Sequence, residues 1–212
     1  MRQRAGVVRK RLELDERRTQ LLELGLELFS DRSYDDVSID DIAAAAEISK
    51  GLLYHYFPTK RAFYVETVRY GANGLLEATM PDMSLPESER AYAGLTAYLD
   101  YVQAHAGAYQ ALLRSGIGMD QEVASILEDT RSQIIDRMLE NIGVREERPV
   151  FRTMVRAFIG SVEAASLDWL EKRHLDREQL LRMLLVLLYW TIRTAMAFDP
   201  EAGVVLDLPP PF

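Results

Sequence analysis

Residues 49–56 combine side chains that could bind nucleic acid, in the order Ser-Lys-Gly-Leu-Leu-Tyr-His-Tyr. The tyrosine hydroxyls and the His55 imidazole can donate hydrogen bonds to phosphate oxygens or reach base edges. Gly51 has no side chain, so that another backbone can approach it closely. Taken alone, Tyr54 and Tyr56 could equally be core aromatics, and a lone histidine is more often structural than a ligand. No second metal-binding residue stands at metal spacing beside His55, so we expect no metal site there.

The rest of the chain does not offer the parts of a catalytic site. It has no cysteine, which excludes disulfides, thiolate zinc sites and cysteine nucleophiles. His105 and His174 are isolated, and we find neither a Gly-rich phosphate loop nor a Ser-His-Asp spacing. The sequence therefore predicts a protein that is not an enzyme and has no cofactor.

Helices must position residues 49–56, because apolar residues recur at spacings of three and four and strand alternation is absent. Ser38 can cap one short helix, with Asp41 in the place of the capping-box Glu, and Thr59 can cap a later one. Two short helices on a tight turn, preceded by a third, indicate a helix-turn-helix. The expected helices are residues 15–31, 38–46, 49–56, 60–79, 87–104, 107–115, 119–142, 147–173 and 176–198.

Charge is distributed unevenly along the chain. Residues 1–65 hold eleven Lys/Arg and eleven Asp/Glu, so the net charge of −8 lies in residues 66–212. The first eleven residues carry five Lys/Arg and no acid, which suggests a polyanion contact at one end, although a solvated N-terminus would look the same. The longest apolar run has eight residues, 183–190, against about 20 for a membrane span. We expect a soluble, cytoplasmic protein without a membrane partner.

Two stretches carry a specific resemblance. Residues 37–43 read Val-Ser-Ile-Asp-Asp-Ile-Ala, and residues 48–60 read Ile-Ser-Lys-Gly-Leu-Leu-Tyr-His-Tyr-Phe-Pro-Thr-Lys. These two stretches carry a helix cap, a turn, a glycine, a pair of aromatic residues and a closing lysine, all in register. Residues 15–65 therefore resemble the DNA-binding head of the TetR/AcrR family of bacterial transcriptional regulators. The remainder matches only in length and helix count. The resemblance implies a homodimeric repressor that a small ligand, held in the body, releases from operator DNA.

This resemblance predicts an all-α fold, with an N-terminal three-helix helix-turn-helix head and a five- to six-helix body for ligand binding and dimerisation. The expected parts are a basic arm (1–14), the DNA-binding head (15–62), the body (63–198) and a Pro-rich tail (199–212). Leu52 departs from the small or polar residue usual in the family, and Tyr56 from the usual His. Leu52 could touch a thymine methyl, or pack inward and read nothing. By position, the residues expected at DNA are Ser38, Ser49, Lys50, Gly51, Leu52, Tyr54, His55, Tyr56, Thr59 and Lys60.

The body is rich in aromatic and aliphatic residues, most of which we expect to form its core. A sensor pocket there would be apolar with a few polar anchors, which favours a small hydrophobic or acyl-type effector over a sugar. Arg114 could face an anionic head group or be a solvated cation near a helix end. The candidate ligand-binding residues are Leu99, Gln103, Tyr109, Leu113, Arg114, Met119, Ile126, Phe158 and Glu163.

The last expected helix is apolar on nearly every side from Leu180 to Ile192. Such a helix must be buried all round, so a second copy of the chain is expected to cover it together with helix 147–173. The candidate dimer-interface residues are Val155, Ile159, Val162, Leu184, Leu188, Trp190 and Thr191. The alternative function is a DNA-binding nucleoid or structural factor with the same head and no effector.

Overall fold

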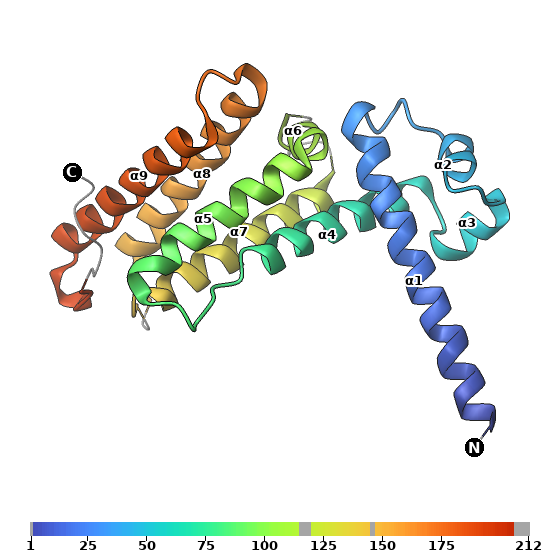
Figure 1. Ribbon diagram of the computed structural model, residues 1–212, viewed down its shortest axis with the longest axis horizontal. Coiled ribbons are helices and arrows are strands. Elements are labelled where there is room, and N and C mark those ends of the chain that lie inside the picture. Colours follow the sequence, from blue (N-terminus) through green and yellow to red (C-terminus); the bar gives the residue numbers. More distant parts are fainter. Residues whose placement is uncertain (1, 115–119, 145–146, 206–212) are drawn as a thin grey trace. The chain divides into compact units, whose positions relative to one another are not determined.

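The computed structural model describes residues 2–114, 120–144 and 147–205, with side chains from Leu14 onward except that of Glu87. Within these ranges the chain forms nine α-helices, one short 3-10 turn and no strand (Figure 1), which confirms the predicted all-α fold. The helices are α1 (Arg2–Asp31), α2 (Ile39–Ala45), α3 (Lys50–Tyr56), α4 (Lys60–Ala78), α5 (Glu87–Ala104), α6 (Ala106–Arg114), α7 (Gln121–Asn141), α8 (Pro149–Lys172) and α9 (Arg177–Phe198).

The first helix is longer than the sequence predicts. Helix α1 begins at Arg2, so the expectation of a start near residue 15 is wrong. Arg, Lys, Leu, Ala and Glu dominate the added segment and are strong helix formers, and no proline interrupts it. The other predicted helices start and end within two residues of their observed bounds. The tail differs as well, since Pro200–Ala202 form a 3-10 turn and residues 206–212 lie outside the described part.

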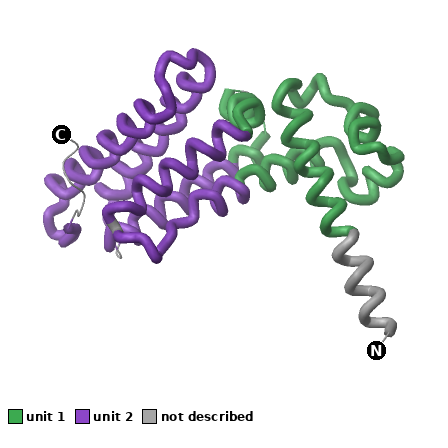
Figure 2. The backbone as a smooth tube through the Cα atoms, in the orientation of Figure 1, with its two compact units in different colours: residues 1–72, 105–124 green, residues 73–104, 125–212 purple. Residues whose placement is uncertain are grey.

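The chain divides into two compact units, shown in different colours in Figure 2. Residues 1–72 and 105–124 form the first unit, and residues 73–104 and 125–212 form the second. Helix α6 joins the first unit by packing on α1. A Cβ at Gly107 would lie 2.6 Å from Cβ of Ser30, so that only glycine permits this close approach. This division differs from the expected boundary between residues 62 and 63.

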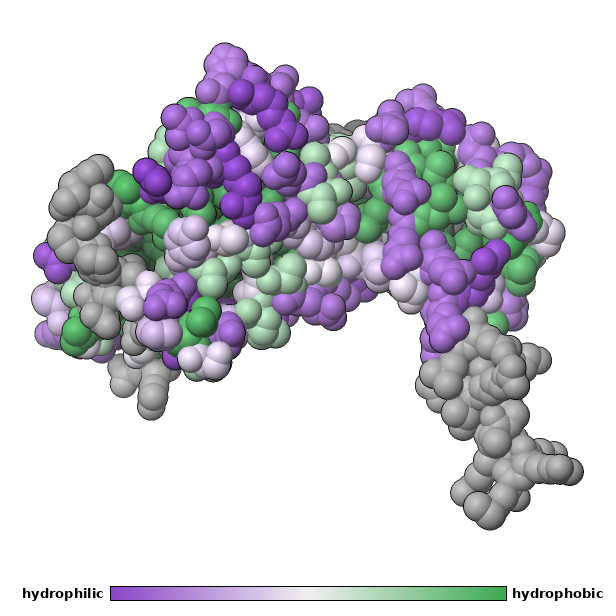
Figure 3. Space-filling view, viewed as in Figure 1, coloured by the Kyte–Doolittle hydropathy of each residue, from purple (hydrophilic) through white to green (hydrophobic). Residues whose placement is uncertain are grey.

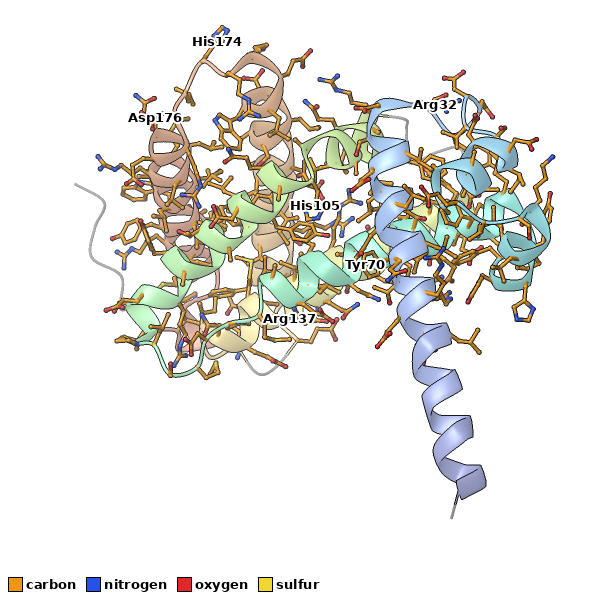
Figure 4. All side chains as sticks on the ribbon, turned by 45° about the vertical axis from the view of Figure 1, so that its right-hand side comes forward. Arg32, Tyr70, His105, Arg137, His174 and Asp176 are labelled. Atoms are coloured by element: carbon orange, nitrogen blue, oxygen red, sulfur yellow. The ribbon has the colours of Figure 1, made fainter. Side chains whose placement is uncertain are left out.

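One hydrophobic core holds α1, α2, α3 and the start of α4 together. The Phe57 and Phe63 rings meet edge to face, with centroids 5.0 Å apart. On the surface of the unit, Arg18 of α1 pairs with Glu66 of α4 at 2.5 Å, and Tyr70 of α4, labelled in Figure 4, donates to Glu23 of α1. The buried core residues are Leu21, Leu22, Phe29, Val37, Ile42, Ala43, Leu53, Phe57 and Phe63.

In the second unit, α9 packs on α8 and α5. The turn between α8 and α9, which carries His174 in Figure 4, is fixed by Trp169, whose Nε1 donates to the Leu175 carbonyl at 3.0 Å. Asp176 caps α9 as predicted, because its side chain accepts from the Gln179 amide. Among the described residues, α9 has the length and composition of a membrane span. However, one face of α9 is buried in the chain's own core, and the core helix of a soluble protein passes the same test of length and composition.

Candidate DNA-binding surface

Helix α2 is fixed at its start by a reciprocal cap. The Ser38 hydroxyl accepts a hydrogen bond from the Asp41 amide at 3.1 Å, and the Ser38 amide donates to Oδ2 of Asp41 at 2.8 Å. The bond from the Ser38 amide, followed by those from the Ser38 hydroxyl and Arg32, lowers the pKa of the Asp41 carboxyl from 3.8 to about 2. The predicted capping box is therefore present, and it satisfies two amides that a helix start leaves unpaired.

The turn between α2 and α3 sets the direction of α3. Glu47 has φ of 54°, in the left-handed region that few non-glycine residues adopt. The Ile48 amide donates to the Ala43 carbonyl at 3.0 Å and the Glu47 amide to the Ala44 carbonyl at 3.1 Å. These two bonds form a Schellman motif, which closes the end of α2. Arg17 of α1 also donates to the Ala46 carbonyl at 3.2 Å, so the first helix holds the turn in place.

Helix α3 presents a mixed face to solvent. Ser49 caps it by accepting from the Leu52 amide at 3.2 Å. Leu53 is fully buried in the core, whereas Leu52 is 41% exposed and Tyr54 47% exposed. Leu52 does not pack inward, which removes one of its two expected roles. In Figure 3, hydrophobic and hydrophilic side chains lie side by side over α2 and α3.

Gly51 lies on this face with open space around it. A Cβ placed there would have only the Ser49 hydroxyl within 4 Å, at 3.9 Å. The backbone is helical at this position, so neither packing within the described residues nor a left-handed conformation requires a glycine. Glycine costs roughly 0.5–1 kcal/mol relative to alanine inside a helix. Without a side chain at this position, another molecule can approach the backbone of α3 closely.

The remaining predicted DNA-binding residues lie on or beside the same helices. Lys50 Nζ lies 2.5 Å from Asp40 Oδ1, and this hydrogen bond raises the pKa of Lys50. Tyr56 is half-buried against the core. Thr59 accepts from the Ala62 amide at 3.0 Å and so caps α4 as expected. Lys60 Nζ lies 4.2 Å from the centre of the Tyr34 ring, a cation–π contact.

The structure adds positioning residues that sequence reasoning missed. Arg32 donates to Asp41 Oδ2 at 3.0 Å and so reinforces the cap of α2. Tyr34 holds the ammonium group of Lys60, as described above. Arg32 and Tyr34 stand in the segment before α2. Helical periodicity therefore does not connect them with their partners Asp41 and Lys60. The only signal in the sequence is that an arginine and a tyrosine stand close to the motif.

The candidate ligand-binding residues do not form one lining. Leu99, Ile126 and Phe158 are core residues of the second unit, and Glu163 there pairs with Arg131, whose Nε lies 2.8 Å from Oε1. Gln103 and Arg114 are exposed, because each stands near the end of its helix. Tyr109 and Leu113 are half-buried on α6 in the first unit, and Met119 lies outside the described residues.

An open hollow of about 630 Å³ lies along α5 in the second unit. None of the candidate ligand-binding residues lines it. It is bordered by Leu85, Ser88, Glu89, Tyr92, Ala93, Thr96, Ala97 and Asp100.

The candidate dimer residues need a correction. Six of the seven are buried within the chain itself and have almost no surface left for a partner, whereas Trp190 is 54% exposed. The prediction chose apolar residues without knowing which face of each helix points outward, whereas α8 and α9 each bury one face against the protomer core. The six buried residues are Val155, Ile159, Val162, Leu184, Leu188 and Thr191.

Comparison with known proteins identifies the family. Residues 21–67 match the model described as "Bacterial regulatory proteins, tetR family", and residues 87–191 match "Tetracyclin repressor-like, C-terminal domain". The structure is similar to the crystal structure of a tetR-family transcriptional regulator from Streptomyces coelicolor. That similarity has a TM-score of 0.81 and 32% identity, over 89% of this chain and 86% of the other. The chain belongs to the TetR family of transcriptional regulators.

Two named relatives of the HTH type are regulators of opposite sign. The transcriptional activator FasR of Mycolicibacterium smegmatis is 26% identical over 134 residues, 62% of this chain. The transcriptional repressor DhaR of Mycobacterium sp. strain GP1 is 34% identical over 76 residues, 34% of this chain. The matched stretches span 61% and 38% of the lengths of these two proteins.

Proposed function

We propose that this chain is a cytoplasmic DNA-binding transcriptional regulator, a homodimeric repressor that a small hydrophobic ligand releases from its operator. The observation that carries DNA binding is α3, a capped helix on a closed turn that exposes Gly51, Leu52, Tyr54 and His55. A recognition helix needs such a surface, because side chains and backbone must meet the edges of bases in the major groove.

The exposed faces of α8 and α9 support a homodimer. Met183, Leu187 and Trp190 follow one another at spacings of four and three, and all three are exposed on α9. On α8, Ala157, Gly160 and Ala164 are exposed at similar spacing, and a Cβ at Gly160 would meet nothing within 4 Å. Large apolar side chains beside a row of small residues can interdigitate with a second copy across a two-fold axis.

The interior of the second unit supports a hydrophobic effector. It is lined by apolar side chains with few polar groups, such as Ser166, whose hydroxyl accepts a hydrogen bond from the Tyr98 hydroxyl at 3.1 Å. A ligand that enters such an interior must itself be largely apolar, because unpaired polar groups are costly there. The alternative remains a structural DNA-binding factor, in which this interior is simply core.

The connections between the units suggest how a ligand acts on the head. The chain passes between them inside α4 after Ala72, at His105 between α5 and α6, and inside α7 after Ala124. Each connection ends in a part of the first unit that is firmly held. Arg61 of α4, for example, forms two hydrogen bonds of 2.8 and 2.9 Å with Asp120, which precedes α7. A displacement of the second unit would therefore reach α4 directly and α1 through α6.

The test is a binding titration of the purified chain on the DNA upstream of its own gene. We expect protection of a short palindromic site, with an affinity that falls when the effector is added. Coupling of about 1–3 kcal/mol is typical, and operator DNA must weaken effector binding by the same factor. If the chain binds every duplex with equal affinity, and if ligands extracted with the protein do not change that affinity, the result would favour the structural DNA-binding factor. Failure to bind any duplex would contradict both.

A further inference from the structure

Helix α3 has only one of the side chains that most often read purines, that of Lys50. Arg or Lys contacts guanine and Asn or Gln contacts adenine through paired hydrogen bonds. The seven residues of α3 are Lys-Gly-Leu-Leu-Tyr-His-Tyr, with no Arg, Asn or Gln. The ammonium group of Lys50 is already held by Asp40 at 2.5 Å. Hydrogen-bond reading by α3 therefore falls mainly to Tyr54 and His55.

Leu52 is the apolar side chain that this surface offers. It is 41% exposed, although the next residue, Leu53, is fully buried. It is not among the residues packed against the core of the head. Gly51 beside it adds no side chain, and a Cβ there would have only one atom within 4 Å. Because the neighbouring Gly51 has no side chain, the exposed isobutyl group of Leu52 can reach a small apolar group in a groove of the DNA.

The major groove offers one such group. Each thymine carries a C5 methyl group there, and cytosine has none, so an apolar contact distinguishes the two pyrimidines. Removing a methyl group from an apolar contact weakens binding about fourfold, the equivalent of about 0.8 kcal/mol.

We propose, on the basis that α3 is the DNA-reading helix, that Leu52 is a specificity-determining residue whose side chain contacts the C5 methyl of an operator thymine. Leu52 thus reads A·T against G·C without a hydrogen bond. Tyr54 and His55 contact phosphates or other base edges beside it.

The experiment removes methyl groups from the operator one at a time. The operator is first selected from random duplexes with the full-length chain and narrowed by footprinting. Each thymine is then replaced by deoxyuridine, which keeps the pairing and every hydrogen-bonding group and loses only the methyl. Dissociation constants are measured by fluorescence anisotropy at one salt concentration, for the wild-type chain and for Leu52→Ala. Tyr54→Phe is the matched control, because it keeps the exposed ring and changes no apolar contact of Leu52.

We expect the double-mutant cycle to show coupling between the Leu52 side chain and the methyl group of one operator thymine. Deoxyuridine there weakens wild-type and Tyr54→Phe binding about fourfold, and Leu52→Ala binds the natural operator more weakly but loses nothing further. Because Leu52 is exposed, circular dichroism should show that Leu52→Ala folds normally. Equal losses for Leu52→Ala and wild type at every thymine, or no loss anywhere, would overturn the assignment of Leu52 and leave DNA binding intact. Failure of the wild-type chain to select any duplex would overturn the proposed function as well.

Discussion

Replacing Gly51 by alanine separates the stability of the head from its binding to DNA. In the free protein a methyl group at this position meets only the Ser49 hydroxyl, at 3.9 Å. Alanine should therefore stabilise α3 by about 0.5–1 kcal/mol, since it loses less backbone entropy than glycine on folding. For a chain of this length, that gain corresponds to a rise in melting temperature of about 1–4 °C.

On DNA the same methyl group should be harmful. If α3 lies in the major groove with Gly51 against the duplex, the added carbon occupies space that DNA atoms fill. Overpacking of a close contact costs about 1–3 kcal/mol, which weakens binding about 5- to 150-fold. Gly51→Ala is thus expected to be more stable than wild type and a weaker binder, a combination that loss of folding cannot produce.

A matched control is available on α5. Gly94 is also helical, and a Cβ there would meet nothing within 4 Å. Gly94→Ala should raise the melting temperature by a similar amount and leave the dissociation constant for DNA unchanged. Differential scanning calorimetry and fluorescence anisotropy at fixed salt measure the two quantities. If Gly51→Ala binds the operator as tightly as wild type, DNA does not approach α3 at Gly51.

Three further changes test other parts of the account. Because the folded-state pKa of Asp41 is about 2 against 3.8 in the unfolded chain, its stabilising contribution is complete above pH 3.8 and is lost as the pH falls toward 2. Urea unfolding between pH 3.8 and pH 2 should therefore show a smaller loss of stability for Asp41→Asn than for wild type. If the stabilities of the two proteins fall in parallel with pH, the cap does not shift the pKa of Asp41. Trp190→Glu places a charge on the exposed stripe of α9 and should give folded monomers in light scattering, whereas an unchanged dimer would move the interface elsewhere. Deletion of residues 2–11 should flatten the salt dependence of DNA binding and preserve operator preference, because each phosphate neutralised releases about 0.9 counterion; an unchanged slope would show that this segment does not touch DNA.

The DNA-binding head could be predicted because local rules determine it. Ser38 and Thr59 cap helices as the sequence predicts, since a cap depends on residues within three positions. The buried Leu53 follows from helical periodicity in the same way.

Contacts between distant segments could not be predicted in this way. The sequence placed Gly107 at the start of an expected helix and gave no sign that its missing side chain lets α6 approach Ser30. The apolar residues of α9 likewise gave no sign of which face the protomer covers. That depends on how α9 packs on the preceding helix α8 and on α5, which is distant in sequence. For the same reason Leu188 was expected at a dimer interface and is instead buried in the core.

The central claim is that α3 reads a specific DNA sequence, and one competition experiment tests it most directly. Labelled operator, selected with the wild-type chain, is titrated with wild type and with Tyr54→Ala against an excess of scrambled duplex at physiological salt. Specific binding is typically about 10³–10⁷ tighter than non-specific binding, so wild type should prefer the operator by at least about 10³. Tyr54→Ala, which changes an exposed side chain of α3, should lose most of that preference while keeping its fold. Equal affinity of the wild-type chain for operator and scrambled duplex would contradict the account.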